Sequence, residues 1–304
     1  MQWTQRSNSG PGPHWFHAMA YDSARGRTVL YGDNTETWEW DGNVWAQVQV
    51  PGLEPRGAHA MAYDAVHGEV VLFGGNYYDQ NSQNQFPAST WVYNGAQWIQ
   101  RATTGPPPRA SLAMAFDELR ARVVLFGGVF TQNGTQFYGD TWEWDGQNWE
   151  QRSSTGPSPR YAHEMAYDVG CNRVVLFGGT NDGASVLNDI WEWDGAIWTR
   201  RSAEGPPRGD FAMTYDSARG NMVLFGGIDE AGIYRSDTWA YECARLGDMN
   251  RDGSVDGLDI QAFTDVVLSG SVDPAAIYLA DFDVSGSITV ADVEGFSNCL
   301  LNQP

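Results

Sequence analysis

Residues 114–153 read MAFDELRARVVLFGGVFTQNGTQFYGDTWEWDGQNWEQRS, a unit of four short apolar and aromatic segments. Its first tetrapeptide, Met-Ala-Tyr-Asp or a near copy, occurs five times: at 19–22, 61–64, 114–117, 165–168 and 213–216. After each copy comes an apolar run that ends in Gly, and then a Trp-rich segment. Self-similarity with a period near 50 residues indicates an array of repeated structural units.

Each segment of the repeat has the composition of a β-strand. The segments are short, rich in β-branched and aromatic residues, and bounded by Gly, Pro, Asp or Asn. The third and fourth segments are joined by Asp41-Gly42, Asn94-Gly95, Asp145-Gly146 or Asp194-Gly195, pairs that tolerate the positive φ of tight hairpins. Four antiparallel strands in about 50 residues are the size of one propeller blade, so we predict an all-β propeller.

The repeat also resembles a known family. The Gly-Gly pair after the second strand, a Trp or Tyr in the third strand and a Trp in the fourth resemble kelch repeats, across roughly residues 1–243. The first repeat departs from the pattern, because Gly32-Asp33 replaces the Gly-Gly pair. The resemblance implies a kelch-type β-propeller, which we place at residues 1–244.

The two ends of the repeat region complement each other. Residues 2–7 read as a fourth strand without a blade before it, and residues 238–241 read as a third strand without a fourth after it. Pairing them would close a ring of five blades and remove two exposed sheet edges. Kelch propellers usually have six or seven blades, so further blades upstream are the alternative.

One face of the propeller is predicted to carry the long loops 76–89, 129–140, 180–189 and 228–237. Aromatic residues on loops are contact candidates, although several could instead pack on neighbouring blades. An Arg precedes the first strand of blades 2 to 5, where it could bind an acidic ligand or hydrogen-bond the preceding loop in every blade. The predicted ligand-binding residues are Arg56, Arg109, Arg160, Arg208, Tyr77, Tyr78, Phe137 and Tyr138.

Three histidines occupy the same position of the repeat, whereas the three cysteines occupy unrelated positions. His17, His59 and His163 stand where other blades have Leu112 and Phe211, which favours packing over metal binding. Cys171, Cys243 and Cys299 make no disulfide framework, but a bridge between Cys243 and Cys299 is one pairing that would clip the two domains together.

The composition changes at the C-terminus, in residues 245–304. Residues 248–259 place oxygen-bearing side chains at positions 1, 3, 5, 9 and 12 and Gly at position 6, the spacing of a calcium loop. A second loop, residues 281–292, keeps positions 1, 3, 6 and 12, and each loop leads into an apolar, helix-like stretch. We therefore predict an α-helical module with two calcium ions, the second bound more weakly. Its predicted metal ligands are Asp248, Asn250, Asp252, Ser254, Asp256, Asp259, Asp281, Asp283, Ser285, Ser287, Thr289 and Asp292.

The module resembles a type I dockerin. Asp at position 12 and one helix per loop carry the resemblance, which implies docking onto a cohesin partner outside the cell. Positions 10 and 11 are Gly257-Leu258 and Val290-Ala291, where that family usually has a hydroxyl-containing pair. The tail is therefore expected to bind either a cohesin-like partner or a cell-surface anchor.

These features favour a secreted, non-catalytic binding protein whose propeller holds a protein or glycan ligand. A net charge of −20 argues against nucleic acid, and no apolar stretch reaches the length of a membrane span. The N-terminus lacks a signal peptide, so a mature or truncated chain is expected. The alternative is an enzyme, either a polysaccharide-degrading propeller or a copper radical oxidase, although Cys171 lies on the wrong face for the oxidase cross-link.

Overall fold

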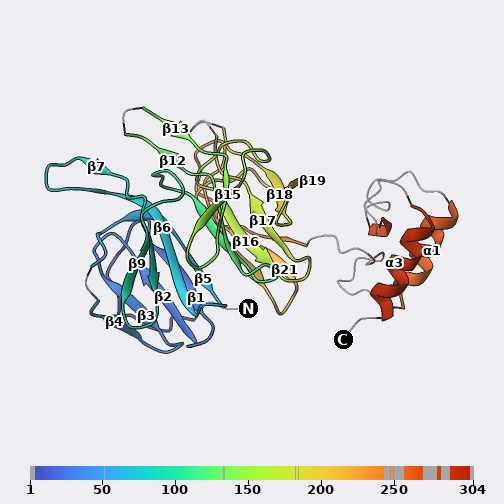
Figure 1. The fold of residues 1–304 in the computed structure, drawn as a ribbon, viewed down its shortest axis with the longest axis horizontal. Coiled ribbons are helices and arrows are strands. Elements are labelled where there is room, and N and C mark those ends of the chain that lie inside the picture. The colour runs from blue at the N-terminus through green and yellow to red at the C-terminus, as the bar shows by residue number, and fades with distance from the viewer. Residues whose placement is uncertain are drawn as a thin grey trace. The chain divides into compact units, whose positions relative to one another are not determined.

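The computed structural model describes residues 4–50, 52–132, 134–181, 183, 185–242, 247, 249, 257–269, 279–281 and 288–301. The chain divides into two compact units. Residues 1–168, 172–215 and 222–240 form the first, and residues 169–171, 216–221 and 241–304 form the second. The first unit consists of β-strands, and the second contains the two helices (Figure 1).

The first unit is a β-propeller of five antiparallel blades, as predicted. Blade 1 contains β1 (Ala18–Asp22), β2 (Arg27–Tyr31), β3 (Thr37–Trp40) and β4 (Trp45–Val48). Blade 2 contains β5 (Gly57–Asp64), β6 (Glu69–Tyr78), β8 (Thr90–Tyr93) and β9 (Trp98–Ala102), with β7 (Asn84–Gln85) paired to the end of β6. Blade 3 contains β10 (Ala113–Asp117), β11 (Arg122–Phe126), β14 (Thr141–Trp144) and β15 (Trp149–Ser153), with the β12 (Val129–Phe130) and β13 (Gln136–Phe137) hairpin between β11 and β14. Blade 4 contains β16 (Glu164–Asp168), β17 (Arg173–Phe177), β18 (Asp189–Trp193) and β19 (Trp198–Glu204). Blade 5 contains β20 (Ala212–Asp216), β21 (Asn221–Phe225) and β22 (Thr238–Tyr241).

The core of the propeller lies between successive blades. On β11, Val123 and Leu125 pack in a cluster with blade 2, whereas Val124 and Phe126 pack in a cluster with blade 4. Side chains of a strand alternate between its two faces, so a strand that is buried on both sides needs a continuous apolar run. The repeated Val-Leu-Phe run of the sequence is therefore the second strand of each blade.

Two kinds of hydrogen bond join neighbouring blades in a repeated pattern. The indole of the Trp that begins a fourth strand donates to a Thr hydroxyl in the third strand of the preceding blade. The three examples are Trp98 to Thr37 (2.9 Å), Trp149 to Thr90 (2.7 Å) and Trp198 to Thr141 (2.8 Å). Next to the innermost strands, backbone amides donate to the preceding blade: Ala58 to Phe16, Ser111 to Ala58, Ala162 to Ser111 and Asp210 to Ala162, at 2.7–3.1 Å.

The boundary between blade 5 and blade 1 differs from the other four. Met61, Met114 and Met165 are 4–8% exposed, whereas the matching Met19 of blade 1 is 52% exposed. On the other side, Phe225 of β21 is 47% exposed, although its counterparts in blades 1 to 4 are buried. Among the described residues, no backbone hydrogen bond joins these two blades. Both sheet faces are therefore open in the structure.

Residues 4–7, the described part of the predicted N-terminal strand, are not in a strand. The sheet of blade 5 has three strands in the described part of the chain, and residues 4–17 belong to no strand. The local geometry of residues 7–10 nevertheless matches the exit of a blade. The Ser7 hydroxyl donates to the Ser9 carbonyl at 2.6 Å, as the Ser153 hydroxyl at the end of β15 donates to the Thr155 carbonyl at 2.8 Å.

Gly10 shows the same correspondence. A Cβ atom at Gly10 would lie 2.7 Å from the indole of Trp45, and one at Gly105 would lie 2.6 Å from the indole of Trp149. Only glycine fits against the ring at both places, where φ is +143° and +144°. Residues 7–10 therefore lie against blade 1 as the end of a preceding blade would.

The second unit contains α1 (Asp259–Ser269) and α3 (Val290–Leu301). Phe263 and Phe296 stack between these helices, with ring centroids 4.0 Å apart, and Ile288 packs against them. Within the described residues, no helix is long and apolar enough to cross a bilayer.

Cys171, in the turn between β16 and β17, is disulfide-bonded. Because the chain has three cysteines, this bond excludes the Cys243–Cys299 bridge considered from the sequence. Cys243 lies outside the described residues.

Candidate functional site

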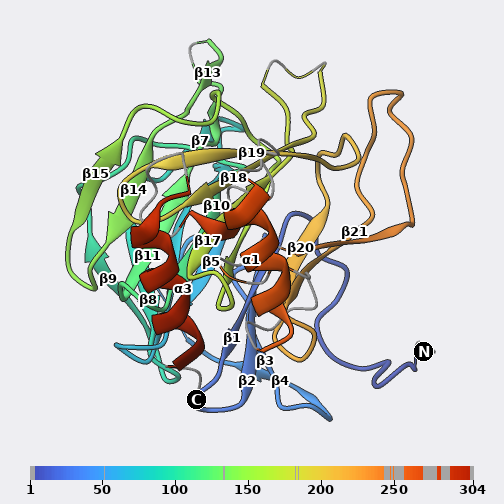
Figure 2. The ribbon, with the colours of Figure 1, turned by 90° about the vertical axis from the view of Figure 1, so that its right-hand side faces the viewer.

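The long loops between the second and third strands build one face of the propeller, called the loop face here. The β6–β7 and β12–β13 hairpins extend beyond the sheets of blades 2 and 3 (Figure 1). The β12–β13 hairpin and the corresponding loop of blade 5, drawn in orange, extend to the same side (Figure 2). This arrangement agrees with the strand order from which the loop face was predicted.

The two hairpins of blades 2 and 3 contact each other. The rings of Phe86 and Phe130 meet edge to face at 4.9 Å, and Gln132 Nε2 donates to the Asn84 carbonyl at 3.3 Å. The hairpins, residues 77–86 and 129–137 (residue 133 not described), are called the hairpin ridge here. The ring contact and the hydrogen bond between the two hairpins stabilise the hairpin ridge.

The aromatic residues predicted from the loops fall into two groups. Tyr78 is 70% exposed on the hairpin ridge, and Tyr77 beside it is half-buried. Phe137 instead stacks on Tyr161 of blade 4, with centroids 5.6 Å apart, and Tyr138 lies under the guanidinium of Arg109 at 4.0 Å. Of the four, Tyr78 offers the largest free surface. Tyr234 on the 228–237 loop of blade 5, also a contact candidate by its position, is 81% exposed.

The four arginines predicted to contact a ligand are buried and paired with carboxylates. Arg109 Nη1 and Nη2 bind Asp140 at 2.7 and 3.0 Å, and Arg160 binds Asp189 at 2.6 and 2.9 Å. Each of these two also donates to a glycine carbonyl of its blade at 3.0 Å. The side chains of Arg56, Arg109, Arg160 and Arg208 are 0–5% exposed. The alternative interpretation, that these arginines hydrogen-bond the preceding loop, therefore agrees with the geometry of Arg109 and Arg160, whose Nε atoms donate to the carbonyls of Pro107 and Ser158.

The electrostatics of these pairs follow from their burial. Burial by itself raises the pKa of Asp140, but the hydrogen bonds and charge of Arg109 outweigh it and lower the pKa below the ordinary value. Asp189 responds to Arg160 in the same way. Both carboxylates are therefore ionised at neutral pH, and each pair is locked as a bidentate ion pair.

Two of the three repeated histidines, His59 and His163, pack as apolar side chains, whereas His17 is exposed. His59 lies edge-on to Tyr31 at 5.7 Å and His163 edge-on to Phe126 at 5.6 Å. Burial, followed by the nearby arginine charge, lowers the pKa of each to about 3. In the described part of the chain, no group of three His, Cys, Asp or Glu side chains is placed to hold a metal ion.

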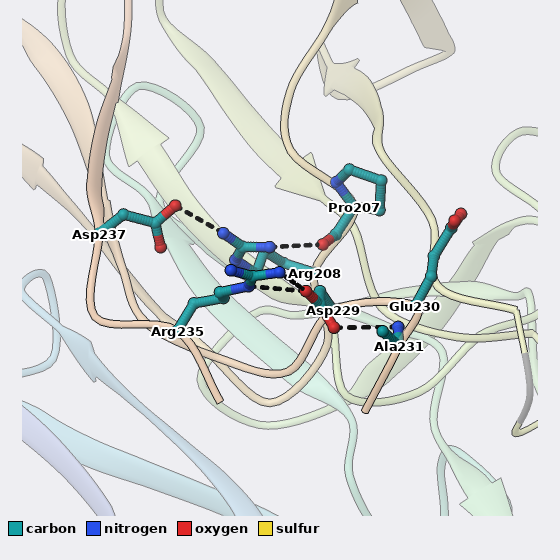
Figure 3. A pocket seen from close by; sticks show the side chains of 7 residues that line it. All are labelled: Pro207, Arg208, Asp229, Glu230, Ala231, Arg235 and Asp237. Carbon is teal, nitrogen blue, oxygen red and sulfur yellow. Dashed lines mark hydrogen bonds and ion pairs between the residues drawn. The ribbon is translucent and has the colours of Figure 1, made fainter. Parts of the chain in front are cut away.

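Blade 5 has a pocket that sequence reasoning did not find. Its volume is about 400 Å³. It is lined by Pro207, Arg208, Asp229, Glu230, Ala231, Arg235 and Asp237 (Figure 3). Arg208 Nη2 binds Asp237 Oδ2 at 2.6 Å, and the Arg235 guanidinium binds Asp229. The signal in the sequence was Arg235, which replaces the Tyr138 and Leu187 of blades 3 and 4.

Two carboxyl groups near the innermost strands have unusual acidity. Glu164 of β16 stands where the other blades have Ala, and burial raises its pKa to about 8, with a smaller contribution from the charge of Asp210. Burial also raises the pKa of Asp210, which adopts a positive φ of 51°. A carboxyl that stays protonated at neutral pH can donate a hydrogen bond or a proton.

Most of the predicted calcium ligands lie outside the described residues. These are Asp248, Asn250, Asp252, Ser254, Asp256, Asp283, Ser285 and Ser287. The described ones are Asp259, Asp281, Thr289 and Asp292. The three aspartates are 0–8% exposed. The Thr289 amide and hydroxyl donate to Asp292 Oδ2 at 2.6 and 3.0 Å, a capping contact that fixes the start of α3.

The comparisons with known proteins define the fold. No protein-family model matches the sequence, and no curated protein matches it. Among solved structures, the one titled "Structure of YjhT" superposes with a TM-score of 0.57 at 11% sequence identity, covering 77% of this chain and 96% of that chain. At this identity the similarity concerns the fold, and it supports the propeller architecture of the first unit.

Proposed function

We propose that the protein is a secreted, non-catalytic binding protein whose loop face holds a protein or glycan ligand. The hairpin ridge is the observation that carries this proposal. Two hairpins extend past the sheets, contact each other through Phe86 and Phe130, and expose Tyr78. An aromatic side chain on loops that are already ordered provides a large contact area at low entropic cost on binding.

A glycan array and a peptide display library, each probed with the full chain, test this function. Replacing Tyr78 with Ala is expected to weaken binding of any hit at least about tenfold, as for a central aromatic contact. Leu119 is a matched control, because it is 62% exposed in the short turn between β10 and β11, on the opposite face. Leu119→Ala should leave binding unchanged. Equal losses in both variants, or no hit at all, would contradict the proposal.

We also propose that the five blades form a closed ring. Blade 1 docks on blade 5, and residues 2–7 add a fourth strand beside β22. Three boundaries pair the Met-bearing face of one blade with the Phe- or Tyr-bearing face of the blade before it, and the two open faces carry matching residues, Met19 and Phe225. The Phe16 amide and the Asp210 carbonyl end the series of inter-blade hydrogen bonds, and neither has a described partner across the open boundary.

Two further pairs support direct docking of blade 1 on blade 5. Trp45 and Thr238 occupy the positions of the bonded Trp198 and Thr141. Trp15 and Tyr234 stand where Tyr161 and Phe137 stack, and they are 73% and 81% exposed. A closed ring would bury both aromatic rings and place the loops of blades 5 and 1 together.

The C-terminal module is proposed to bind two calcium ions and to anchor the propeller to a cohesin-like or cell-surface partner. Its support is the pair of loop sequences and the burial of Asp259, Asp281 and Asp292. The other predicted ligands of the two loops would complete the sites. Calcium would supply charge neutralisation and thereby hold each loop against its helix.

One observation favours an enzyme as the second candidate. Glu164 has a pKa of about 8 next to Asp210, so it could act as a general acid in glycoside hydrolysis. A copper radical oxidase finds less support, because the disulfide of Cys171 removes that thiol from a Tyr cross-link. Release of reducing ends from a panel of polysaccharides, lost in Glu164→Gln, would establish the hydrolase; an inactive wild-type chain would exclude it on that panel.

A further inference from the structure

The arginine–carboxylate pair is bidentate in blades 3 and 4, but in blade 5 the arginine contacts one carboxylate oxygen. In blade 3, Arg109 uses Nε on the Pro107 carbonyl and both Nη atoms on Asp140. In blade 5, Arg208 uses Nη1 on the Pro207 carbonyl and Nη2 on a single oxygen of Asp237. Arg208 Nε and Asp237 Oδ1 are buried without a hydrogen-bond partner among the described residues.

The cover over the pair also changes in blade 5. The residue two positions before the carboxylate is Tyr138 in blade 3, whose ring lies against Arg109 at 4.0 Å, and Leu187 in blade 4. In blade 5 it is Arg235, which turns to Asp229 (Figure 3). A long polar side chain that pairs with a neighbouring carboxylate leaves the space above Arg208 unfilled. The pocket of about 400 Å³ is the result.

The unpaired atoms select the chemistry of a ligand. Leaving a buried donor and a buried acceptor unsatisfied is costly, and a hydroxyl group can satisfy both, because it accepts from Arg208 Nε–H and donates to Asp237 Oδ1. An anion would meet three lining carboxylates, Asp229, Glu230 and Asp237, and a metal cation would meet two guanidinium groups. A neutral ligand with several hydroxyl groups avoids both penalties.

We infer that the blade 5 pocket binds a neutral sugar unit of a glycan. The pocket volume lies in the usual range of about 300–1,000 Å³ for small-ligand sites. The inference rests on the proposed function, because it names the ligand class and one site on the loop face.

Methyl glycosides of glucose, galactose, mannose and N-acetylglucosamine are suitable probes. Saturation-transfer NMR with the full chain is expected to detect at least one of them, and titration gives its dissociation constant. Arg235→Leu copies Leu187 and places an apolar cover over Arg208, so it should weaken binding at least about tenfold. Leu119→Ala, in the short turn between β10 and β11 on the opposite face, is the control and should leave binding unchanged. Glu230→Gln changes an exposed pocket residue without altering the cover, and it should also weaken binding. It therefore tests the inference if Arg235→Leu fails to fold.

Three results would overturn the inference. The first is binding that survives both Arg235→Leu and Glu230→Gln. The second is displacement of the glycoside by inorganic phosphate at equal concentration, which would indicate an anion site. The third is the absence of binding by any methyl glycoside while Tyr78→Ala still abolishes binding of an array hit; the pocket inference then fails although the proposed function stands.

Discussion

His59 and His163 occupy a repeat position that holds Leu112 in blade 3 and Phe211 in blade 5. The sequence predicted packing at this position, and the aromatic contacts agree with it. The repeat thus shows that an apolar side chain serves the same place.

His163→Leu should make the propeller more resistant to acid. The pKa of His163 is lowered from 6.5 to about 3 in the folded chain, so the unfolded state takes up a proton that the folded state refuses. Above pH 6.5, His163 does not reduce the free energy of unfolding. As the pH drops towards 3 it does, by about 2 kcal/mol at pH 5. Urea unfolding at pH 5 and pH 7.5 measures the difference. An identical pH dependence in the variant and wild type would contradict the assignment.

Glu164→Gln should have the opposite pH profile. The pKa of Glu164 is raised from 4.5 to about 8, so the unfolded state releases a proton that the folded state keeps. Stability is then complete below pH 4.5 and falls as the pH rises towards 8, at up to about 1.4 kcal/mol per pH unit. The free energy of unfolding of Glu164→Gln should exceed that of the wild type by about 1 kcal/mol or more at pH 8, with little difference at pH 4. The prediction is refuted if the wild type gains stability relative to Glu164→Gln between pH 4 and pH 8.

At the scale of elements, the inter-blade Trp–Thr hydrogen bonds show how blades are joined. Trp198 Nε1 donates a buried hydrogen bond to Thr141 Oγ1 at 2.8 Å. Thr141→Val removes this acceptor and should lower the free energy of unfolding by about 1 kcal/mol. Thr238→Val makes the same change at the boundary of blades 5 and 1. If blade 1 closes the ring, Trp45 loses its partner and the cost is similar. If the boundary stays open, Thr238→Val costs nothing.

The sequence predicted the strands well because their signals are local. The continuous apolar run Val123–Phe126 and the Asp145-Gly146 turn determine a strand and a hairpin without help from distant residues. The role of Arg109 was harder to predict, because its partner Asp140 lies 31 residues away and the sequence shows a charge but not its burial. The blade 5 pocket depends on one substitution, Arg235, whose effect appears only in the folded loop.

For the whole molecule, the account predicts two independently stable units. Removing calcium with a chelator should unfold residues 247–304, because clustered carboxylates repel each other without the ion, and should leave the propeller folded. Hydrogen exchange followed by mass spectrometry separates the two responses. Protection of Phe263 and Phe296 that is unchanged by the chelator would remove the calcium proposal and leave the propeller untouched.

The N-terminal segment shows what the sequence predicted beyond local structure. Trp3–Ser7 repeats the pattern of Trp149–Ser153, which is a fourth strand in blade 3. Residues 4–7 form no strand in the structure, because strand formation there needs an edge from the other end of the propeller. A pattern in the sequence can name the strand, but its pairing depends on docking of two distant blades.

The most direct test of the binding function is a crystal structure of the full chain with a hit from the glycan array or the peptide library. The account predicts ligand density on the loop face, in contact with Tyr78 on the hairpin ridge or with Arg208 and Arg235 in the blade 5 pocket. Density confined to the opposite face, at the short turns that contain Leu119, would contradict it.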